Sequence, residues 1–299
     1  MDLKLNFSGH ETFPLRQLWL YKAHELIKLY EKPFTKDADK SIAHFGIGKN
    51  MLKSMGYWIQ ATQLYKSDNK GDYTPSHFGK YLFDENFGDP YLERIESLWL
   101  LHIHLCTNKT KNSCLYWIFN INNLPDFNYD DFKRGIHRWN ELECGGVNNI
   151  GKDSTLEKDF KLSLNLYCPR VSKVDFEDIV HFPFWTLGII KQTKGMRQNY
   201  EKIRHNLTDI PKSIFYYSFL RYANLRENVE TISFDDLLND RESPGRILLL
   251  NEHPLRIYLE GLEKDLNGAY IFDDTAGQKL VYKHYDLDPD TYLEKTIYS

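Results

Sequence analysis

Residues 37–74 read DADKSIAHF-GIG-KNMLKSMGYWIQATQL-YKSDNKGDYT and decide the fold of the N-terminal part of the chain. The pattern predicts helices over 37–45 and 49–64, with the glycines of Gly46-Ile47-Gly48 breaking the chain between them. The stretch 65–74 carries a turn-rich tip, Asp68-Asn69-Lys70-Gly71, between two strand-like flanks. This order of helix, glycine turn, helix and hairpin is that of a winged helix-turn-helix.

The second helix of this pair has the two faces that a recognition helix needs. One stripe is apolar, and the polar groups lie at the N-terminal end. Lysine suits phosphates or guanine edges, and asparagine can pair with an adenine edge. A structural role or a protein-binding role is also open, because helix pairs with a glycine turn serve both. The candidate DNA-binding residues are Lys49, Asn50, Lys53 and Ser54 in the helix and Lys66 and Lys70 in the hairpin.

Composition excludes several classes of protein. The chain has 299 residues with 41% hydrophobic residues, which is too apolar for a disordered chain. No apolar run approaches the roughly 18–20 residues of a membrane span, and the first residues lack the pattern of a signal peptide. The four cysteines are dispersed and show no CxxC spacing. We therefore expect a cytoplasmic protein with reduced thiols and no membrane partner.

Charge is unevenly distributed along a chain whose formal net charge is −4. Residues 184–226 carry a net charge of +6, and residues 227–299 carry −9. Such asymmetry indicates a surface for a polyanion beside an acidic surface, although two solvated helix faces of opposite sign would also explain it. The candidate phosphate contacts in the basic stretch are Lys191, Lys194, Arg197 and Arg204.

A dense polar cluster lies near the N-terminus, where residues 7–16 read FSGHETFPLR. His10 or Glu11 could act as acid or base on a phosphodiester, and Arg16 could clamp its charge, which makes these three the candidate catalytic residues. The alternative is structural. Ser8 and Glu11 have the spacing of a capping box for the first helix.

The rest of the chain predicts a mostly helical α+β fold, with a helical middle region and a small C-terminal α/β part. We expect three parts: a winged helix-turn-helix domain over 1–85, a helical region over 86–180, and a basic then acidic region over 181–299. Short apolar runs at 246–250 and 269–272 predict strands. Further helices are expected at 18–30, 74–83 with Thr74 as its cap and Pro75 in its first turn, 93–106, 114–119, 126–141, 158–167, 187–194, 215–221 and 234–239.

Other possible chemical sites have bland explanations. His102 and His104 would diverge on the expected helix, so a place in the core is favoured over a metal site. Asp273 and Asp274 could serve a metal-dependent nuclease, but a turn closed by Gly277 explains them equally well. The chain lacks the phosphate loop, the dinucleotide fingerprint, the zincin motif and the nucleophile elbow.

Several stretches together resemble a known bacterial family. They are residues 7–16, Gly46-Ile47-Gly48-Lys49-Asn50-Met51, Asp89-Pro90-Tyr91-Leu92-Glu93 with 98–102, Ser243-Pro244-Gly245-Arg246 and Asp274-Thr275-Ala276-Gly277. In combination they resemble the SspB-like domain-of-unknown-function family of DNA phosphorothioation (Dnd/Ssp) defence clusters. The resemblance implies a role in anti-phage defence, in which sulfur replaces a non-bridging phosphate oxygen of DNA.

The resemblance implies a DNA-binding component whose family includes a DNA-nicking member. A nicking endonuclease would need a divalent metal, Mg²⁺ or Mn²⁺, as its cofactor. The expected partners are double-stranded DNA and the sulfurtransferase and ATPase proteins of the same system. A homodimer is expected by analogy with other winged helices. Two alternatives stay open: a non-enzymatic winged-helix adaptor that recruits those proteins, and a transcription regulator.

Overall fold

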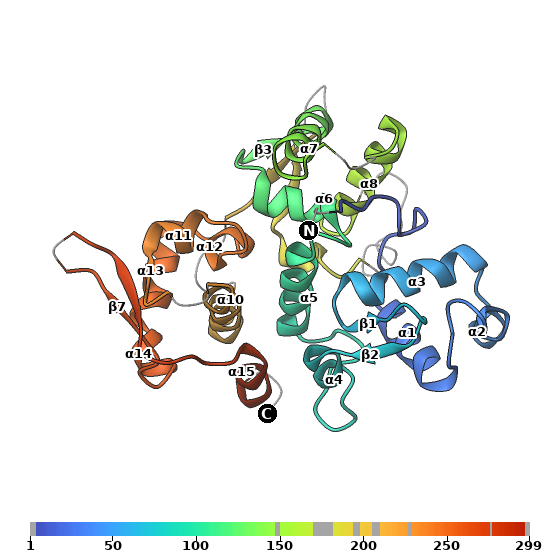
Figure 1. Ribbon diagram of the computed structural model, residues 1–299, viewed down its shortest axis with the longest axis horizontal. Helices are drawn as coiled ribbons and strands as arrows, with labels where there is room; N and C mark the ends of the chain where they lie inside the picture. The colour runs from blue at the N-terminus through green and yellow to red at the C-terminus, as the bar shows by residue number, and fades with distance from the viewer. Residues whose placement is uncertain are drawn as a thin grey trace. The chain divides into compact units, whose positions relative to one another are not determined.

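The computed structural model describes residues 4–146, 150–169, 182–193, 198–204, 210–226, 229–275 and 277–296. The chain forms two compact units, which are joined between Lys202 and Ile203. Each unit combines helices with small antiparallel sheets (Figure 1). The predicted fold class, mostly helical α+β, is confirmed. The finer division at residues 85 and 180 stays a prediction.

The first unit contains the predicted helix, helix pair and hairpin in the predicted order. Both α1 and α2 pack against α3. Gly46 ends α2 in a left-handed conformation with φ of 62°, which a side chain would strain. This turn sets the direction in which α3 leaves α2. The elements are α1 (Trp19–Leu29), α2 (Ala38–Phe45), α3 (Lys49–Ala61), β1 (Tyr65–Ser67) and β2 (Tyr73–Pro75).

The apolar stripe of α3 holds the helix pair against the rest of the unit. Its side chains are at most 1% exposed, so each removes most of its apolar surface from water. The helix therefore has one face fixed in the core, and the opposite face is free to contact solvent or a ligand. The fully buried stripe consists of Leu52, Met55, Trp58 and Ile59.

The helix after the hairpin, α4 (His77–Leu82), begins later than predicted. Ser76, and not Thr74, caps it, because the Ser76 hydroxyl accepts a 3.0 Å hydrogen bond from the Gly79 amide. Pro75 belongs to β2. Gly79 lies against Leu64, where an added Cβ would come within 2.2 Å of the carbonyl oxygen. This close approach lets α4 support the base of the hairpin.

The remainder of the first unit is a helical layer with a three-stranded sheet. Nearly every side chain of α5 is buried, and His102 and His104 are core residues, as predicted. The elements are α5 (Ile95–Thr107), α6 (Ser113–Tyr116), the π-helical turn η1 (Trp117–Ile121), β3 (Asp126–Phe127), α7 (Tyr129–Glu143), α8 (Asp153–Asn165), the 3₁₀ turn η2 (Trp185–Leu187), β4 (Ile190–Thr193) and β5 (Asn199–Lys202).

The predicted helix over 187–194 is wrong. Gly188 is left-handed after η2, and Ile190–Thr193 then forms strand β4 of the sheet β3-β5-β4. Ile190 packs into the core while Lys191 points outward. A run of four residues is too short for its periodicity to separate a helix from a strand, and pairing with β5 decides the outcome.

The second unit surrounds α10 (Lys212–Asn224), whose aromatic residues are buried. The predicted strand over 246–250 is wrong, because Ser243 caps and Pro244 starts the short helix α12 (Pro244–Ile247). The predicted strand near 270 is confirmed as β7. The other elements are β6 (Thr231–Ser233), α11 (Phe234–Asn239), α13 (Glu252–Glu260), α14 (Leu262–Asp265), β7 (Tyr270–Asp273), β8 (Leu280–Lys283) and α15 (Pro289–Thr296), with sheet order β6-β8-β7.

Candidate nucleic-acid interface

The N-terminal end of α3 presents polar groups to solvent. Lys49, Asn50 and Lys53 are exposed, and among the described residues no side chain pairs with Lys49 or Asn50. Ser54, the fourth candidate of this helix, is fully buried, and its hydroxyl donates to the Phe13 carbonyl at 3.4 Å. Ser54 therefore holds the helix in place and offers no group to a ligand.

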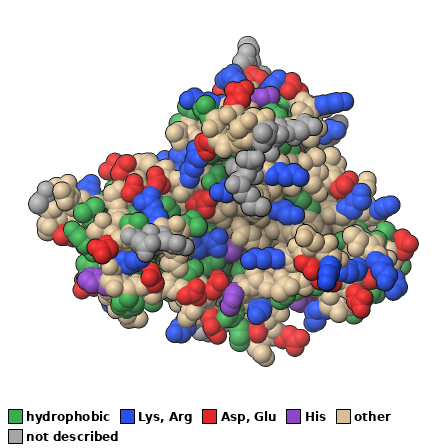
Figure 2. All heavy atoms as spheres, viewed as in Figure 1, with side chains coloured by type: hydrophobic (Ala, Val, Ile, Leu, Met, Phe, Trp, Pro, Cys, Tyr) green, Lys and Arg blue, Asp and Glu red, His purple; other side chains and the backbone are tan. Residues whose placement is uncertain are grey.

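The hairpin adds two further cations, Lys66 in β1 and Lys70 at the tip. Both are exposed, and neither side chain has a partner within the described ranges. The tip is held from below by Lys32, whose ammonium contacts the Asp72 carboxylate at 2.6 Å and the Lys70 carbonyl. Figure 2 shows several Lys and Arg side chains over the part of the first unit where α2 and α3 lie, with acidic side chains between them.

The segment that precedes α1 is fixed by a buried pair. His10 Nε2 and Asp159 Oδ1 lie 2.6 Å apart, and both side chains are at most 5% exposed. The same carboxylate oxygen accepts the Ser8 amide at 2.8 Å, and the Thr12 amide donates to His10 Nδ1 at 3.1 Å. Because Nδ1 accepts, the ring proton lies on Nε2 and is donated to Asp159. The ring also stacks on Trp58 of α3 at 6.2 Å.

Backbone strain is concentrated in this segment. Ser8, Glu11 and Thr12 have positive φ values of 69°, 49° and 65°, and Thr12 is β-branched, which makes its conformation rare. Gly9 lies so close to Tyr57 that an added Cβ would come within 2.6 Å of its ring. Such strain persists only where surrounding contacts over-determine the backbone, and it clusters at functional sites.

The strained segment lies directly beside the exposed end of α3. The Trp58 indole donates to the Phe13 carbonyl at 3.0 Å, and the Lys53 ammonium lies 3.5 Å from a Glu11 carboxylate oxygen. Both groups of this ion pair are partly exposed, so the pair is weak and can be exchanged for a ligand. We define the N-terminal interface as residues 8–13, Lys49, Asn50, Lys53, Lys66 and Lys70.

The structure gives each candidate catalytic residue a place. Both ring nitrogens of His10 are occupied by protein groups, which suits a positioning role. Glu11 pairs with Lys53, and the exposed guanidinium of Arg16 lies over the Trp19 ring at 5.7 Å. A catalytic role of the three stays a prediction. The alternative capping box is wrong, because α1 begins at Trp19 without a side-chain cap.

The basic stretch does not form one continuous track. Lys191 is exposed on β4 in the first unit, whereas Arg204 lies in the second unit and donates to the Leu250 carbonyl. Burial lowers the pKa of Arg204 from its usual value. Lys194 and Arg197 lie outside the described residues. The predicted role of Lys191 and Arg204 at phosphates stays a prediction.

Sequence reasoning missed Asp159, the residue on which the strained segment depends. It lies in α8 between buried apolar residues and is only 4% exposed. A carboxylate on the apolar face of a predicted helix is a signal in itself, because buried acids need a partner. That signal shows that a partner exists, but it does not show that the partner is a histidine near the N-terminus.

Metal-binding groups are not gathered in the described part of the chain. Within those ranges, no group of three or more His, Cys, Asp or Glu side chains is arranged to hold a metal ion. Asp273 accepts the Thr275 amide in the turn after β7, and Asp274 pairs with Arg256 at 2.7 Å. These two carboxylates therefore have structural partners, in line with the turn explanation.

Comparison with known proteins identifies close structural relatives. A protein-family model described as "Protein of unknown function (DUF4007)" matches residues 7–297. The chain is similar to two solved structures with the titles "Magnesium ion-bound SspB crystal structure" and "SspB crystal structure", both at 26% identity and a TM-score of 0.83. These alignments cover 98% and 99% of this chain and 86% and 88% of the SspB chains. The family resemblance predicted from the sequence is thereby confirmed.

The other comparisons add little. The search of curated proteins finds no match to this chain. No helix among the described residues combines the length and the apolar character that a bilayer span requires.

Proposed function

The chain belongs to the DUF4007 family, and from that premise we propose that it is the DNA-engaging component of an Ssp-type DNA phosphorothioation system. Its likeness to SspB over nearly the whole chain supports this proposal. In it, α2, α3 and the β1–β2 hairpin act as a winged helix-turn-helix on duplex DNA, and the sulfurtransferase and ATPase of the system are its protein partners.

One observation carries the proposal: the exposed end of α3 offers cations that the protein itself does not use. Lys49 and Asn50 have no side-chain partner among the described residues, and Lys53 has only the weak contact with Glu11. The helix N-terminus adds a partial positive charge, since its first amides have no intrahelical acceptor. We assign Lys49 and Lys53 to phosphates or guanine edges and Asn50 to an adenine edge.

The strained segment has a positioning role in this proposal. The His10–Asp159 bond and the Trp58–Phe13 bond fix residues 8–13 against α3. The segment then meets the DNA backbone next to the recognition helix, with Glu11 exchanging its contact with Lys53 for a phosphate on Lys53. Arg16, exposed just beyond this segment, is the group best placed to add a second phosphate contact.

Nicking is the finer part of the proposal. One SspB structure carries a magnesium ion in its title, but the described residues of this chain supply no cluster that fits such an ion. We therefore derive no step through a metal. The activity is tested by incubating supercoiled plasmid with the protein in Mg²⁺, in Mn²⁺ and in EDTA, and by following conversion to open circle.

The DNA-binding part is tested by charge reversal. The Lys49→Glu/Lys53→Glu double variant should lower duplex affinity by at least a hundredfold at moderate salt, because it replaces two phosphate contacts by repulsion. Arg138→Glu/Lys152→Glu is the matched control, with the same change in charge on exposed residues of α7 and at the start of α8. Equal affinities of the two double variants would overturn the assignment.

The adaptor remains the second candidate, because the second unit is acidic and could dock a basic partner. Retarded but intact plasmid in every metal condition would favour it. A complex with the sulfurtransferase or ATPase that forms without DNA and needs residues 227–299 would support it further.

A further inference from the structure

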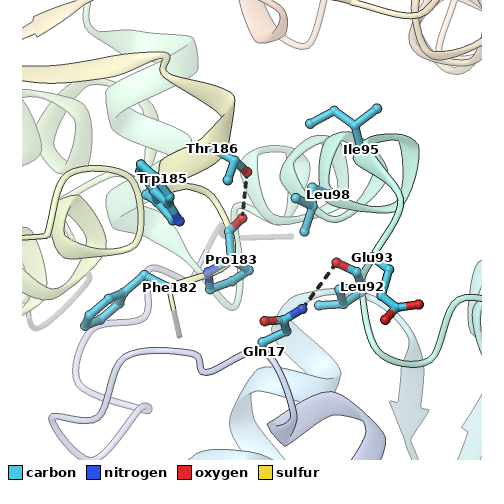
Figure 3. A pocket seen from close by; sticks show the side chains of 9 residues that line it. All are labelled: Gln17, Leu92, Glu93, Ile95, Leu98, Phe182, Pro183, Trp185 and Thr186. Atoms are coloured by element: carbon cyan, nitrogen blue, oxygen red, sulfur yellow. Dashed lines mark hydrogen bonds between the residues drawn. The ribbon is translucent and has the colours of Figure 1, made fainter. Parts of the chain in front are cut away.

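A surface pocket opens in the first unit between the segment before α1, the start of α5 and the turn η2. Its volume is about 450 Å³, within the range of small-molecule sites. Leu92 and Leu98 form a buried apolar floor, and Ile95 and Trp185 form exposed walls, at 37% and 36% exposure. Figure 3 shows these side chains converging on the pocket from different elements.

Trp185 is held rigidly although its ring is exposed. The flanking residues Phe184 and Leu187 are buried, Phe184 stacks on Tyr167 at 5.2 Å, and Gly188 ends the turn in a left-handed conformation. An exposed aromatic ring on an anchored turn loses little conformational freedom when a flat ring stacks on it. Of the aromatic residues in the basic stretch that we considered as stacking platforms, Tyr200, Phe215 and Tyr217 are core residues, whereas Trp185 is available.

The polar groups of the pocket are few and oriented. Gln17 Nε2 donates to the carbonyls of Tyr91 at 2.7 Å and Leu92 at 3.4 Å, so its amide oxygen is the atom left to accept from a ligand. In Figure 3 this oxygen points away from Leu92, toward the side formed by Phe182 and Pro183. The Trp185 indole N–H has no partner among the described residues and can donate.

Cation and pocket adjoin in the sequence. Arg16 precedes Gln17, is exposed and has no carboxylate partner within the described ranges. An aromatic wall, one acceptor, one donor and an adjacent cation match the parts of a nucleotide: a flat base with hydrogen-bonding edges and a phosphate. An apolar side chain of a protein partner would use the floor and walls but would leave the Gln17 oxygen, the indole N–H and Arg16 unused.

We propose that this pocket binds a single unstacked nucleobase of the DNA, with the base stacked on Trp185, its edge on Gln17 Oε1 and its phosphate on Arg16. The inference rests on the proposed function, since it names the part of the DNA that is taken up beside the recognition helix. A base lifted from the duplex gives access to the backbone next to it, which any reaction at a phosphodiester needs.

The test measures the affinity of the full chain for three 20-bp duplexes by fluorescence anisotropy. One is fully paired, one carries a single bulged 2-aminopurine nucleotide, and one carries an abasic nucleotide at the same bulge. The two bulged duplexes share backbone and flexibility, so their ratio isolates the base. We expect the base-containing bulge to bind about 5- to 100-fold more tightly, as for one base on an aromatic platform.

Two variants act on the pocket without touching the core. Trp185→Ala should bring the ratio to one, whereas Trp185→Phe should keep most of it because a ring remains. Ile95→Trp should also abolish the ratio by filling the pocket. Leu142→Ala, at an apolar side chain on α7 that is 69% exposed, is the control and should leave the ratio unchanged.

The outcomes separate this inference from the proposed function. Equal binding of the two bulged duplexes by the unaltered protein, or a ratio that survives Trp185→Ala and Ile95→Trp, overturns the base pocket. Tight binding of the paired duplex would then still support the recognition helix. If no duplex binds, a single-stranded oligonucleotide that binds only with an aromatic residue at 185 would keep the pocket and overturn the winged helix. No binding to any of them would overturn both.

Discussion

His10 and Asp159 lie 149 residues apart in the sequence and share a buried 2.6 Å hydrogen bond. This bond joins the strained segment before α1 to α8, and the stacking of His10 on Trp58 joins it to α3 as well. The segment beside the candidate DNA-binding helix is therefore part of the core network of the first unit. A change in α8 is expected to reach the N-terminal interface.

The first prediction concerns this pair. Asp159→Ala should lower the free energy of unfolding by about 3–5 kcal/mol, because it leaves the His10 N–H and the Ser8 amide buried without an acceptor. Asp159→Asn should cost only about 1–2 kcal/mol, since the amide oxygen can still accept but carries no charge. Denaturant unfolding of the three proteins measures both values. A loss below 1 kcal/mol for the alanine variant would mean that the pair does not hold the segment.

The second prediction concerns the hairpin. Lys66→Ala and Lys70→Ala should each weaken duplex binding at every sequence alike and reduce the slope of log K against log salt by about 0.9, because each removes one phosphate contact. Asn69→Ala is a neutral control at the same exposed tip. Binding titrations at a series of salt concentrations give the slopes. Slopes identical to that of the unaltered protein would place the hairpin away from the DNA.

The third prediction concerns Thr12, whose φ of 65° is unfavourable for a β-branched residue. Thr12→Gly should raise the free energy of unfolding by about 1 kcal/mol, because glycine adopts this conformation without strain. Thr35→Gly, at an exposed threonine without a positive φ, should be destabilising instead. Thermal unfolding distinguishes the two signs. Destabilisation of equal size at both positions would contradict the proposed strain.

The fourth prediction concerns pH. His24 of α1 hydrogen-bonds the Tyr65 hydroxyl at 2.7 Å and stacks on Phe83 at 4.2 Å. Burial, with the charge of Lys28 as a smaller cause, holds the pKa of His24 below its usual value of 6.5, while the nearby Glu25 opposes the shift. The unfolded chain therefore takes up a proton near pH 6.5, before the folded chain does. The resulting stability is complete above pH 6.5 and is lost as the pH falls to the folded pKa.

The measurement is the change in melting temperature between pH 7.5 and pH 5.5. His24→Gln keeps a hydrogen-bonding group toward Tyr65 but cannot titrate, so its melting temperature should fall less on acidification than that of the unaltered protein. The same fall in both proteins would show that His24 does not contribute.

Local signals in the sequence were sufficient for the N-terminal elements. The glycine turn at Gly46, the apolar stripe of α3 and the polar tip of the hairpin each act over a few residues, and all three features appear where they were predicted. Charge reasoning placed Lys49 and Lys53 at the exposed end of α3. It failed for Ser54, because position alone does not show that a small polar side chain is covered by a neighbouring segment.

The errors have tertiary or capping causes. Ile190–Thr193 became a strand because β5 pairs with it, and nothing in those four residues announces a partner. Residues 246–250 looked like a strand by composition, although Ser243 and Pro244 just before them are the start signal of a helix. Asp159 could be suspected as a buried acid, but its partner His10 is set by the fold.

The clamp under the hairpin has a kinetic consequence. A two-stranded ribbon with three residues in each strand is too small to hold one shape alone, yet Lys32 ties its tip at Asp72 and at the Lys70 carbonyl before any ligand arrives. DNA would meet a finger that already has its bound form, so little chain entropy is lost in the complex. Association should then occur at the rate of charge-steered diffusion, and the lifetime of the complex should decide between one DNA site and another.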